Sequence, residues 1–213
     1  MDAKELVNKL HWLGHDSFRL DGPPVVYFDP WKLKDGLPTA DLVLVSHEHA
    51  DHCSPDDVKK ISGPDTVVVA SVTAAEKLPG AKIVRPGDRV TVSGVEIEAV
   101  RAYNVNKFRS PGVPFHPPEA EHVGFVVTLD GVRVYFAGDT DHIPEMVDIA
   151  CDVALLPVSG KYVMTVEESA EAARTLSPQI VVPMHYGAGI GTAGDGRHFT
   201  ELYSGQVSLL AVE

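Results

Sequence analysis

The sequence predicts an α/β protein in which sheets form the middle layers and helices cover the outside. Short apolar segments separated by Gly, Pro and Asp turn signals fill most of the chain, which is typical of strands. Two alternations of helix and strand follow toward the C-terminus, as in layered α/β folds. The chain has 213 residues, of which 44% are hydrophobic and 23% are charged. This size and composition predict one globular domain, residues 1–213.

Most predicted strands are short apolar or alternating segments bounded by turn residues. The segment 42–45 is continuously apolar, as in a strand buried on both faces. Ser93-Gly94 and Asp130-Gly131 each separate two such segments and therefore predict hairpins. In chain order, the predicted strands are 12–13, 17–20, 25–28, 42–45, 66–70, 90–92, 95–102, 123–129, 132–137, 153–156 and 180–182.

Three helices are predicted from capping residues and apolar spacing. Ser54 is a suitable N-cap for the first helix, and Gly63 ends it. In the last helix, Thr165 and Glu168 have the spacing of a capping box, and an apolar face follows them. The longest segment without predicted structure is 104–121, and loops of that length are often functional. The predicted helices are 54–62, 74–78 and 165–176.

The charge balance limits the classes of partner. Lys and Arg number 18 against 30 Asp and Glu, so the formal net charge is −12. This disfavours nucleic acid and anionic membranes as partners, although a metal centre can still attract a small anionic substrate. We see neither a signal peptide nor an apolar run near the roughly 18 residues of a membrane span. We therefore expect a cytoplasmic protein whose partner is a small-molecule substrate; whether it is a homo-oligomer stays open. The two cysteines, Cys53 and Cys151, agree with a reducing compartment.

The chain has 10 histidines, which is an unusually high number, and some of them are arranged in a pattern. His47, His49, Asp51 and His52 follow the spacing His-x-His-x-Asp-His. Imidazole and carboxylate groups are ligands for zinc and its neighbours in the first transition row. The tract follows a predicted buried strand and precedes a helix N-cap, and ligands in α/β folds gather at such strand ends.

Other metal-type side chains follow other predicted strands. Asp139 comes after the strand 132–137, His185 comes after 180–182, and His116 lies in the long loop. We expect these strand ends to meet at one rim and to form a metal site there. The alternatives are scattered surface histidines or one closed structural zinc. A structural zinc more often recruits thiolates, whereas Cys53 is the only cysteine near the tract.

Two histidines of the long loop compete for one ligand position. His122 directly precedes the predicted strand 123–129, so the pleat would fix the direction of its side chain. His116 precedes Pro117 and Pro118, which restrict the chain and would hold the ring at low entropic cost. We predict His116 as the ligand, with His122 at the surface or at the start of the strand.

Further polar residues could support metal ligands or contact a substrate, and each has a structural alternative. His15 lies either beside the metals or in a hydrogen-bonded turn. Asp29 either orients a metal-bound imidazole or caps a turn. Tyr186 either donates to a reaction oxyanion or packs in the core. Lys107 and Arg109 either meet an anionic group or belong to a solvated loop. The remaining candidates near these positions are Tyr103, Asn104, Asn106 and Asp141.

Three motifs of the chain are His47-Glu48-His49-Ala50-Asp51-His52, Gly138-Asp139-Thr140 and Met184-His185-Tyr186-Gly187. Together they resemble the metallo-β-lactamase superfamily, and the resemblance extends over nearly the whole chain. Motifs at 12–15, 28–31, 103–106 and 157–160 are further similar to small bacterial and archaeal hydrolases near L-ascorbate-6-phosphate lactonase. The resemblance implies a four-layer αββα sandwich, metallo-β-lactamase-like.

The same resemblance implies two metal positions. His47, His49 and one later histidine would hold the first ion. Asp51, His52 and His185 would hold the second ion, and Asp139 would bridge the two. The flavodiiron branch typically has an acidic residue where His49 stands, so histidine here favours zinc. Mn²⁺ or Ni²⁺ remains open, because the affinity order alone does not fix the metal.

The resemblance thus implies a binuclear hydrolase, with Asp51 and Asp139 as its catalytic residues. Two zinc ions would lower the pKa of a shared water enough to give a metal-bound hydroxide near neutral pH. This nucleophile would cleave an ester, lactone or phosphoester bond of a small molecule. One alternative is a phosphodiesterase or nuclease acting on RNA or cyclic nucleotides; the acidic charge and the lack of a basic insertion argue against RNA. The other is a non-catalytic metal-binding domain, although the ligand set would leave a position open for water.

Overall fold

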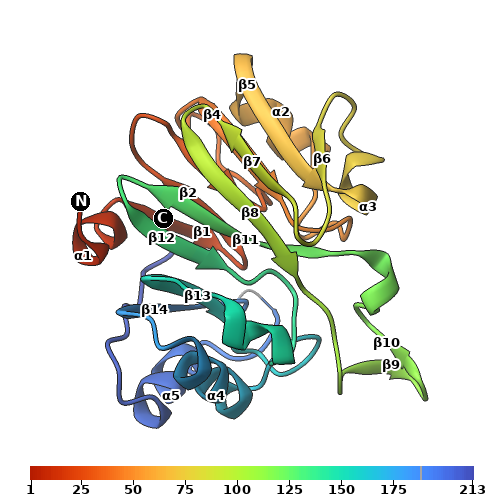
Figure 1. Cartoon of the computed structure of the whole chain (residues 1–213), viewed down its shortest axis with the longest axis vertical. Helices are drawn as coiled ribbons and strands as arrows, with labels where there is room; N and C mark the ends of the chain where they lie inside the picture. Colours follow the sequence, from red (N-terminus) through yellow and green to blue (C-terminus); the bar gives the residue numbers. More distant parts are fainter. Residues whose placement is uncertain (188) are drawn as a thin grey trace.

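A computed structural model describes residues 1–187 and 189–213 of the chain. In this part of the protein, two six-stranded sheets and one two-stranded ribbon are present. The sheets lie face to face (Figure 1). The helices α2 (Pro55–Ile61) and α3 (Val72–Ala75) lie outside one sheet, and α4 (Val166–Leu176) and α5 (Asp195–Leu202) lie outside the other. The predicted four-layer αββα sandwich is therefore confirmed.

The first sheet is formed by the N-terminal part of the chain, in the order β1-β2-β3-β4-β5-β6. Its first three strands are antiparallel, and β3 through β6 run parallel. Parallel strands need crossover connections, and α2 and α3 supply two of them. The strands are β1 (Leu10–Gly14), β2 (Ser17–Leu20), β3 (Val26–Phe28), β4 (Ala40–Val45), β5 (Ser62–Ser71) and β6 (Lys82–Val84).

The second sheet has the order β14-β13-β12-β11-β8-β7. The strands β12, β13 and β14 run parallel, whereas β7, β8, β11 and β12 form antiparallel pairs. Both hairpins expected at Ser93-Gly94 and Asp130-Gly131 are present. The strands are β7 (Arg89–Val92), β8 (Val95–Arg101), β11 (Val123–Leu129), β12 (Val132–Phe136), β13 (Val153–Pro157) and β14 (Ile180–Met184).

The helices cover the outer faces of the sheets. Ser54 caps α2 by accepting from the Asp57 backbone N–H, and Thr165 and Glu168 form the expected capping box of α4. No helix among residues 1–187 and 189–213 is long and apolar enough to cross a membrane. The helices are α1 (Ala3–Val7), α2 (Pro55–Ile61), α3 (Val72–Ala75), α4 (Val166–Leu176) and α5 (Asp195–Leu202), with 3-10 turns at Pro118–Ala120 and Pro144–Asp148.

Alternation along the strands explains the layers. In β4, Leu42 and Leu44 belong to the cluster between the two sheets, together with Phe125 of the second sheet. Val43 of the same strand faces the other way and packs with Val58 of α2. Because successive side chains of a strand point to opposite faces, a continuously apolar strand is buried on both sides.

Five helices and strands were not predicted from the sequence. The strand β6 and the helix α5 have few buried side chains, so their apolar patterns are weak; α5 buries only Gly196 and Phe199. The helix α1 buries Ala3, Leu6 and Val7, but it is too short for a helical period to be recognised in the sequence. The segment 104–121, expected without structure, contains a small ribbon of β9 (Phe108–Ser110) and β10 (Val113–Pro114). This ribbon extends away from the two sheets (Figure 1).

The strand ends converge at one edge between the sheets. The loop after β4 meets the start of β11, where the Val123 N–H donates to the Ser46 carbonyl. The loop after β14 meets the turn between β1 and β2, where the His185 N–H donates to the His15 carbonyl. The candidate ligands on these loops are therefore brought to the same place.

The glycine of β11 permits this convergence, and its substitution tests it. A Cβ atom at Gly124 would lie 2.8 Å from the carbonyl oxygens of Phe136 and Ala137, just before the loop that carries Asp139. We expect Gly124→Ala to lower the free energy of unfolding by about 1–3 kcal/mol, because backbone must move to relieve this overlap. Denaturant melts measure the loss.

Gly194→Ala is the matched control for this substitution. Its added Cβ would meet only the Thr192 hydroxyl oxygen, at 3.6 Å, and its φ of −86° suits alanine. The free energy of unfolding of this variant should stay within about 0.5 kcal/mol of wild type. If Gly124→Ala and Gly194→Ala had equal free energies of unfolding, β11 would not require a glycine at position 124.

Candidate metal centre

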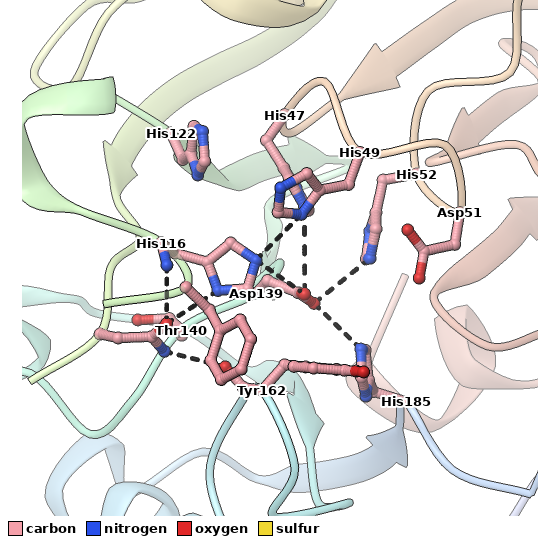
Figure 2. A network of polar contacts seen from close by, with 12 residues as sticks. His47, His49, Asp51, His52, His116, His122, Asp139, Thr140, Tyr162 and His185 are labelled. Carbon is pink, nitrogen blue, oxygen red and sulfur yellow. Dashed lines mark hydrogen bonds and ion pairs between the residues drawn. The ribbon is translucent and has the colours of Figure 1, made fainter. Parts of the chain in front are cut away.

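The loop between β4 and α2 carries the histidine tract and turns tightly. The backbone N–H groups of His52 and Cys53 both donate to the His49 carbonyl, at 3.0 and 2.8 Å. This turn directs the tract's histidines toward the edge between the sheets. There, Asp139 lies among the rings of His47, His49, His52, His116 and His185 (Figure 2). His47 and His52 are buried, whereas His49 is about one-third exposed.

Three imidazoles and one carboxylate form the first group of ligand atoms. His49 Nδ1 lies 3.1 Å from His47 Nε2 and 3.2 Å from His116 Nε2. Asp139 Oδ2 lies 3.2 Å from His116 Nε2 and 3.9 Å from His47 Nε2. Ligand atoms about 2.0 Å from a tetrahedral zinc lie about 3.3 Å from one another. The four side chains therefore have the spacing of a tetrahedral site.

A second group lies on the other side of Asp139. Its Oδ1 atom is 3.3 Å from His52 Nε2 and 3.3 Å from His185 Nε2. Asp16 completes this group of mutually close ligand atoms, and His15 forms an overlapping group with His52 and His185. The two oxygens of Asp139 thus face two different sets of imidazoles, as a bridging carboxylate would (Figure 2).

Several polar atoms of this cluster are buried without a hydrogen-bond partner. They include His52 Nε2, His185 Nε2, Asp139 Oδ1 and both carboxylate oxygens of Asp16. Burying polar groups without partners is costly, and a bound cation would satisfy the lone pairs of all of them at once. The residues present therefore fit divalent metal ions held by nitrogen and oxygen ligands.

Cys53 takes no part in this cluster, although it follows the tract directly. Its Sγ atom points toward the Ala74 carbonyl, and burial raises the pKa of the thiol to about 11. The geometry therefore does not support a structural zinc site in which the Cys53 thiolate is a ligand.

The ring nitrogens that face away from the cluster are held by oxygen atoms. His116 Nδ1 lies 3.0 Å from Asn104 Oδ1, and His185 Nδ1 lies 2.8 Å from Ser159 Oγ. Such partners on the outer nitrogen fix the ring orientation and leave the lone pair of Nε2 directed inward. Asn104 also accepts from the His116 backbone N–H and donates to the Tyr162 carbonyl, so it holds the loop as well as the ring.

Asp29 is connected by hydrogen bonds to one histidine of each group. Its Oδ2 atom lies 2.8 Å from His52 Nδ1 and accepts from Ser46 Oγ at 2.5 Å. Ser46 Oγ in turn lies 2.9 Å from His47 Nδ1. The Ser46 backbone N–H donates to the other oxygen of Asp29 at 2.7 Å. One buried carboxylate therefore orients a ligand of each group, directly for His52 and through Ser46 for His47.

The ionisation of the cluster is set by burial and by mutual contacts. Burial holds the pKa of His47 well below its usual range and lowers the pKa of His49, which keeps both imidazoles neutral. Burial opposes ionisation of Asp139, but His52 and His185 outweigh it and hold the pKa of this carboxyl well below normal. Neutral imidazoles and an ionised carboxylate are the forms that bind metal.

Three residues at the cluster have left-handed backbone conformations without being glycine. The φ angles are 55° for His15, 39° for Asp29 and 58° for His185. Such conformations are uncommon for these residues and persist only where the surroundings impose them, often at functional sites. The turns that place these side chains are therefore held by the rest of the fold.

Asp51 lies beside the second group rather than within it. Its Oδ2 atom is 3.2 Å from His15 Nε2, and the side chain is about one-third exposed. His15, whose role was left open, is buried, and its ring packs against that of His185 with centroids 4.2 Å apart. Asp51 thus borders the second group through His15.

His122 is separate from the first group, although it is close to it. Its Nε2 atom lies 2.9 Å from Glu48 Oε2, and its ring packs against that of His47 with centroids 4.9 Å apart. The hydrogen bond from His122 holds the pKa of Glu48 well below its usual range. His122 is buried, which corrects the expectation of a surface position and leaves the strand-start alternative.

Three other candidates make contacts with other side chains of the protein. Lys107 Nζ is engaged by Glu168 Oε2 at 2.6 Å and Asp141 Oδ1 at 3.5 Å, so its charge is neutralised there. Asn106 donates to the same Glu168. Tyr186 is buried and packs against Trp12, with centroids 4.9 Å apart. These contacts agree with the packing alternative for Tyr186 and neutralise the charge that made Lys107 a candidate for binding an anionic group.

Asp16, Ser46 and Ser159 were not predicted as site residues. Asp16 follows His15 in a turn, and nothing in its local pattern distinguishes it from a capping residue. The two serines act through contacts with residues brought close by the fold. Burial raises the pKa of Asp16 to about 7, which is the signal that separates it from an ordinary turn residue.

A cavity of about 490 Å³ opens beside the first group. Its volume is in the range of small-molecule sites. Two of its sides differ in chemistry, since one consists of candidate metal ligands and the other is largely apolar. The lining residues are His49, Asp51, His116 and Asp139 on the first side and Arg109, Phe115, Tyr162 and Ile190 on the second.

The chain is similar to known proteins over most of its length. A family model described as a beta-lactamase superfamily domain matches residues 9–185. A UPF0173 metal-dependent hydrolase of Methanoculleus marisnigri is 38% identical over 185 residues, which are 84% of this chain and 80% of the relative. One from Pyrococcus abyssi is 31% identical over 222 residues and covers 96% of both chains.

A solved structure agrees with these relatives. It comes from Parabacteroides distasonis, carries the name of a metal-dependent hydrolase, and is 34% identical to this chain. Its TM-score is 0.86, over 96% of this chain and 93% of the other. The fold, the metal-type cluster and these matches lead to one conclusion: the chain belongs to the beta-lactamase superfamily, together with the UPF0173 metal-dependent hydrolases.

Proposed function

We propose that this protein is a binuclear hydrolase that binds two zinc ions. It cleaves an ester, lactone or phosphoester bond of a small molecule. The observation that carries this proposal is the position of Asp139. One of its oxygens faces His47, His49 and His116, and the other faces His52 and His185. A carboxylate between two sets of imidazole ligands is the arrangement that two adjacent cations require.

The residues of the two groups would hold the ions. His47, His49, His116 and Asp139 would hold the first, and His52, His185 and Asp139 the second, with Asp51 and Asp16 beside it. Two divalent cations, when bound there, would acidify a water and draw electron density from the scissile bond.

The chain's own residues would provide the remaining functions. Asp29, Ser46, Asn104 and Ser159 keep the rings in place, so little reorganisation is needed when a substrate arrives. Asp51 lines the cavity and, as an ionised carboxylate, can accept a hydrogen bond from a water and so orient it. The apolar side of the cavity would exclude bulk water from the reacting bond.

The number of bound ions tests the two-site arrangement. Protein saturated with Zn²⁺ and then freed of excess metal should retain about two ions per chain, because one tetrahedral ion cannot use both sets of ligands. Elemental analysis against protein concentration measures this ratio. A ratio of one or less, at saturating metal, would be incompatible with a binuclear centre.

Paired alanine substitutions test the choice between the two loop histidines. His116→Ala should lose the ion of the first position, because the His116 ring contributes to that group. His122→Ala should retain both ions, because its ring contacts Glu48 instead, and only stability should fall. Metal content and circular dichroism of both variants decide it. Metal loss from His122→Ala with a preserved fold would move the ligand to that position.

The bridging role of Asp139 has its own test. Asp139→Asn keeps the size of the side chain but removes the charge that both positions share. We expect hydrolysis to fall by orders of magnitude, on the order of 10²-fold or more, with the fold retained. The initial rate on any ester or lactone that wild type turns over gives the comparison. Turnover close to wild type would rule out a bridging carboxylate.

A further inference from the structure

We propose that the cavity selects substrates that combine a flat apolar group with an anionic group, and that Arg109 binds the anion. This inference rests on the proposed function, because it concerns the substrate of the same site. It depends on three features of the apolar side of the cavity: two aromatic rings, an unpaired arginine, and their position opposite the candidate metal ligands.

The aromatic rings form a wall suited to a flat group. Phe115 and Tyr162 meet edge to face, with ring centroids 4.7 Å apart and an interplanar angle of 78°. Both are half-buried and line the cavity, and Ile190 adds an aliphatic side chain beside them. Aromatic side chains favour contact with a further ring in stacked or edge-to-face geometry. An aryl group would thus lie against this wall with its ester near His116 and Asp139.

Arg109 is available to bind an anion. One of its terminal nitrogens donates to the Phe115 carbonyl at 3.1 Å, and its guanidinium lies 5.8 Å from the centroid of the Phe115 ring. Among residues 1–187 and 189–213, no carboxylate lies within ion-pair distance of this guanidinium. A guanidinium has five N–H donors, so most of them remain free.

The contrast with Lys107 shows why Arg109 is the residue to consider. Lys107 is on the same segment, but Glu168 and Asp141 bind its ammonium group away from the cavity. Arg109 therefore brings a positive charge to the lining of this cavity, whereas the charge of Lys107 is neutralised by its acidic partners. The planar fork of arginine matches the geometry of carboxylate and phosphate groups.

Two esters of matched shape separate the anionic group from the rest of the molecule. They are 4-acetoxybenzoate, which is anionic, and 4-acetoxybenzamide, which is neutral. Both place an acetate ester on the same aryl ring. Zn²⁺-loaded wild-type protein should show a higher kcat/KM for the anion, and the ratio of the two values is the quantity to follow.

Substitution of Arg109 should remove this preference. In Arg109→Gln, we expect the ratio of kcat/KM values to fall about tenfold, mainly through KM for the anionic ester, because a charge-assisted contact is lost. Arg109→Lys, which retains the positive charge, should have a ratio between those of wild type and Arg109→Gln. If the substitution acted only through the lost hydrogen bond to the Phe115 carbonyl, kcat/KM would fall equally for both esters, and the ratio would stay unchanged.

Lys161→Gln is the matched control for charge. Its ammonium lies 5.1 Å from the Tyr162 ring centroid, but the side chain is not part of the cavity lining. The variant removes the same charge nearby and should leave the ratio at the wild-type value. An unchanged ratio in Arg109→Gln, or an equal fall in Lys161→Gln, would overturn the proposal.

A binding measurement keeps the inference separate from the hydrolase proposal. If wild type cleaves neither ester, calorimetry with 4-hydroxybenzoate and 4-hydroxybenzamide still tests the cavity. Tighter binding of the anion, weakened about tenfold in Arg109→Gln and not in Lys161→Gln, would support the anion site while the ester activity fails. Equal binding of the two compounds to wild type would overturn the anion site.

Discussion

The arrangement of this protein depends on one buried electrostatic contact, in which the carboxylate of Asp139 faces imidazole nitrogens on two sides. The distances of 3.2 Å to His116 and 3.3 Å to His52 and His185 bring groups together that water would otherwise hydrate. Desolvation makes this costly unless the groups are paired or bind cations. The layers of the fold and the turns at its edge therefore have to hold these atoms against their own solvation preference.

A layer of hydrogen bonds supplies that constraint. Asp29, fixed by the Ser46 backbone and hydroxyl, orients His52 directly and His47 through Ser46. Asp29 follows β3 and His185 follows β14, which belong to different sheets, and both have φ angles that favour glycine. The strain of these two turns is carried by the packing between the sheets. Stability of the core and geometry of the metal centre are for this reason linked.

Much of the fold could be predicted because its strands have strong local patterns. The buried segments at β4, β11 and β13 and the capping box of Thr165 and Glu168 are local signals. The helix α5 and the strand β6 have few buried positions, so tertiary contacts rather than periodicity define them. At the site, the spacing of the tract indicated metal chemistry. The carboxylate of Asp16 and the hydroxyl of Ser159 contribute only through distances between separate strand ends, which a single sequence does not contain.

Exposure within the histidine tract shows from which side a substrate would approach. His47 and His52 are buried beneath the cluster, whereas His49 and Asp51 are about one-third exposed. His49 and Asp51 also line the cavity that Arg109, Phe115 and Tyr162 close from the opposite side. The tract thus begins and ends with a buried histidine and exposes the residues between them, which separates two roles. The inner residues anchor the centre to the core, and the outer residues face the space where a bond would be cleaved.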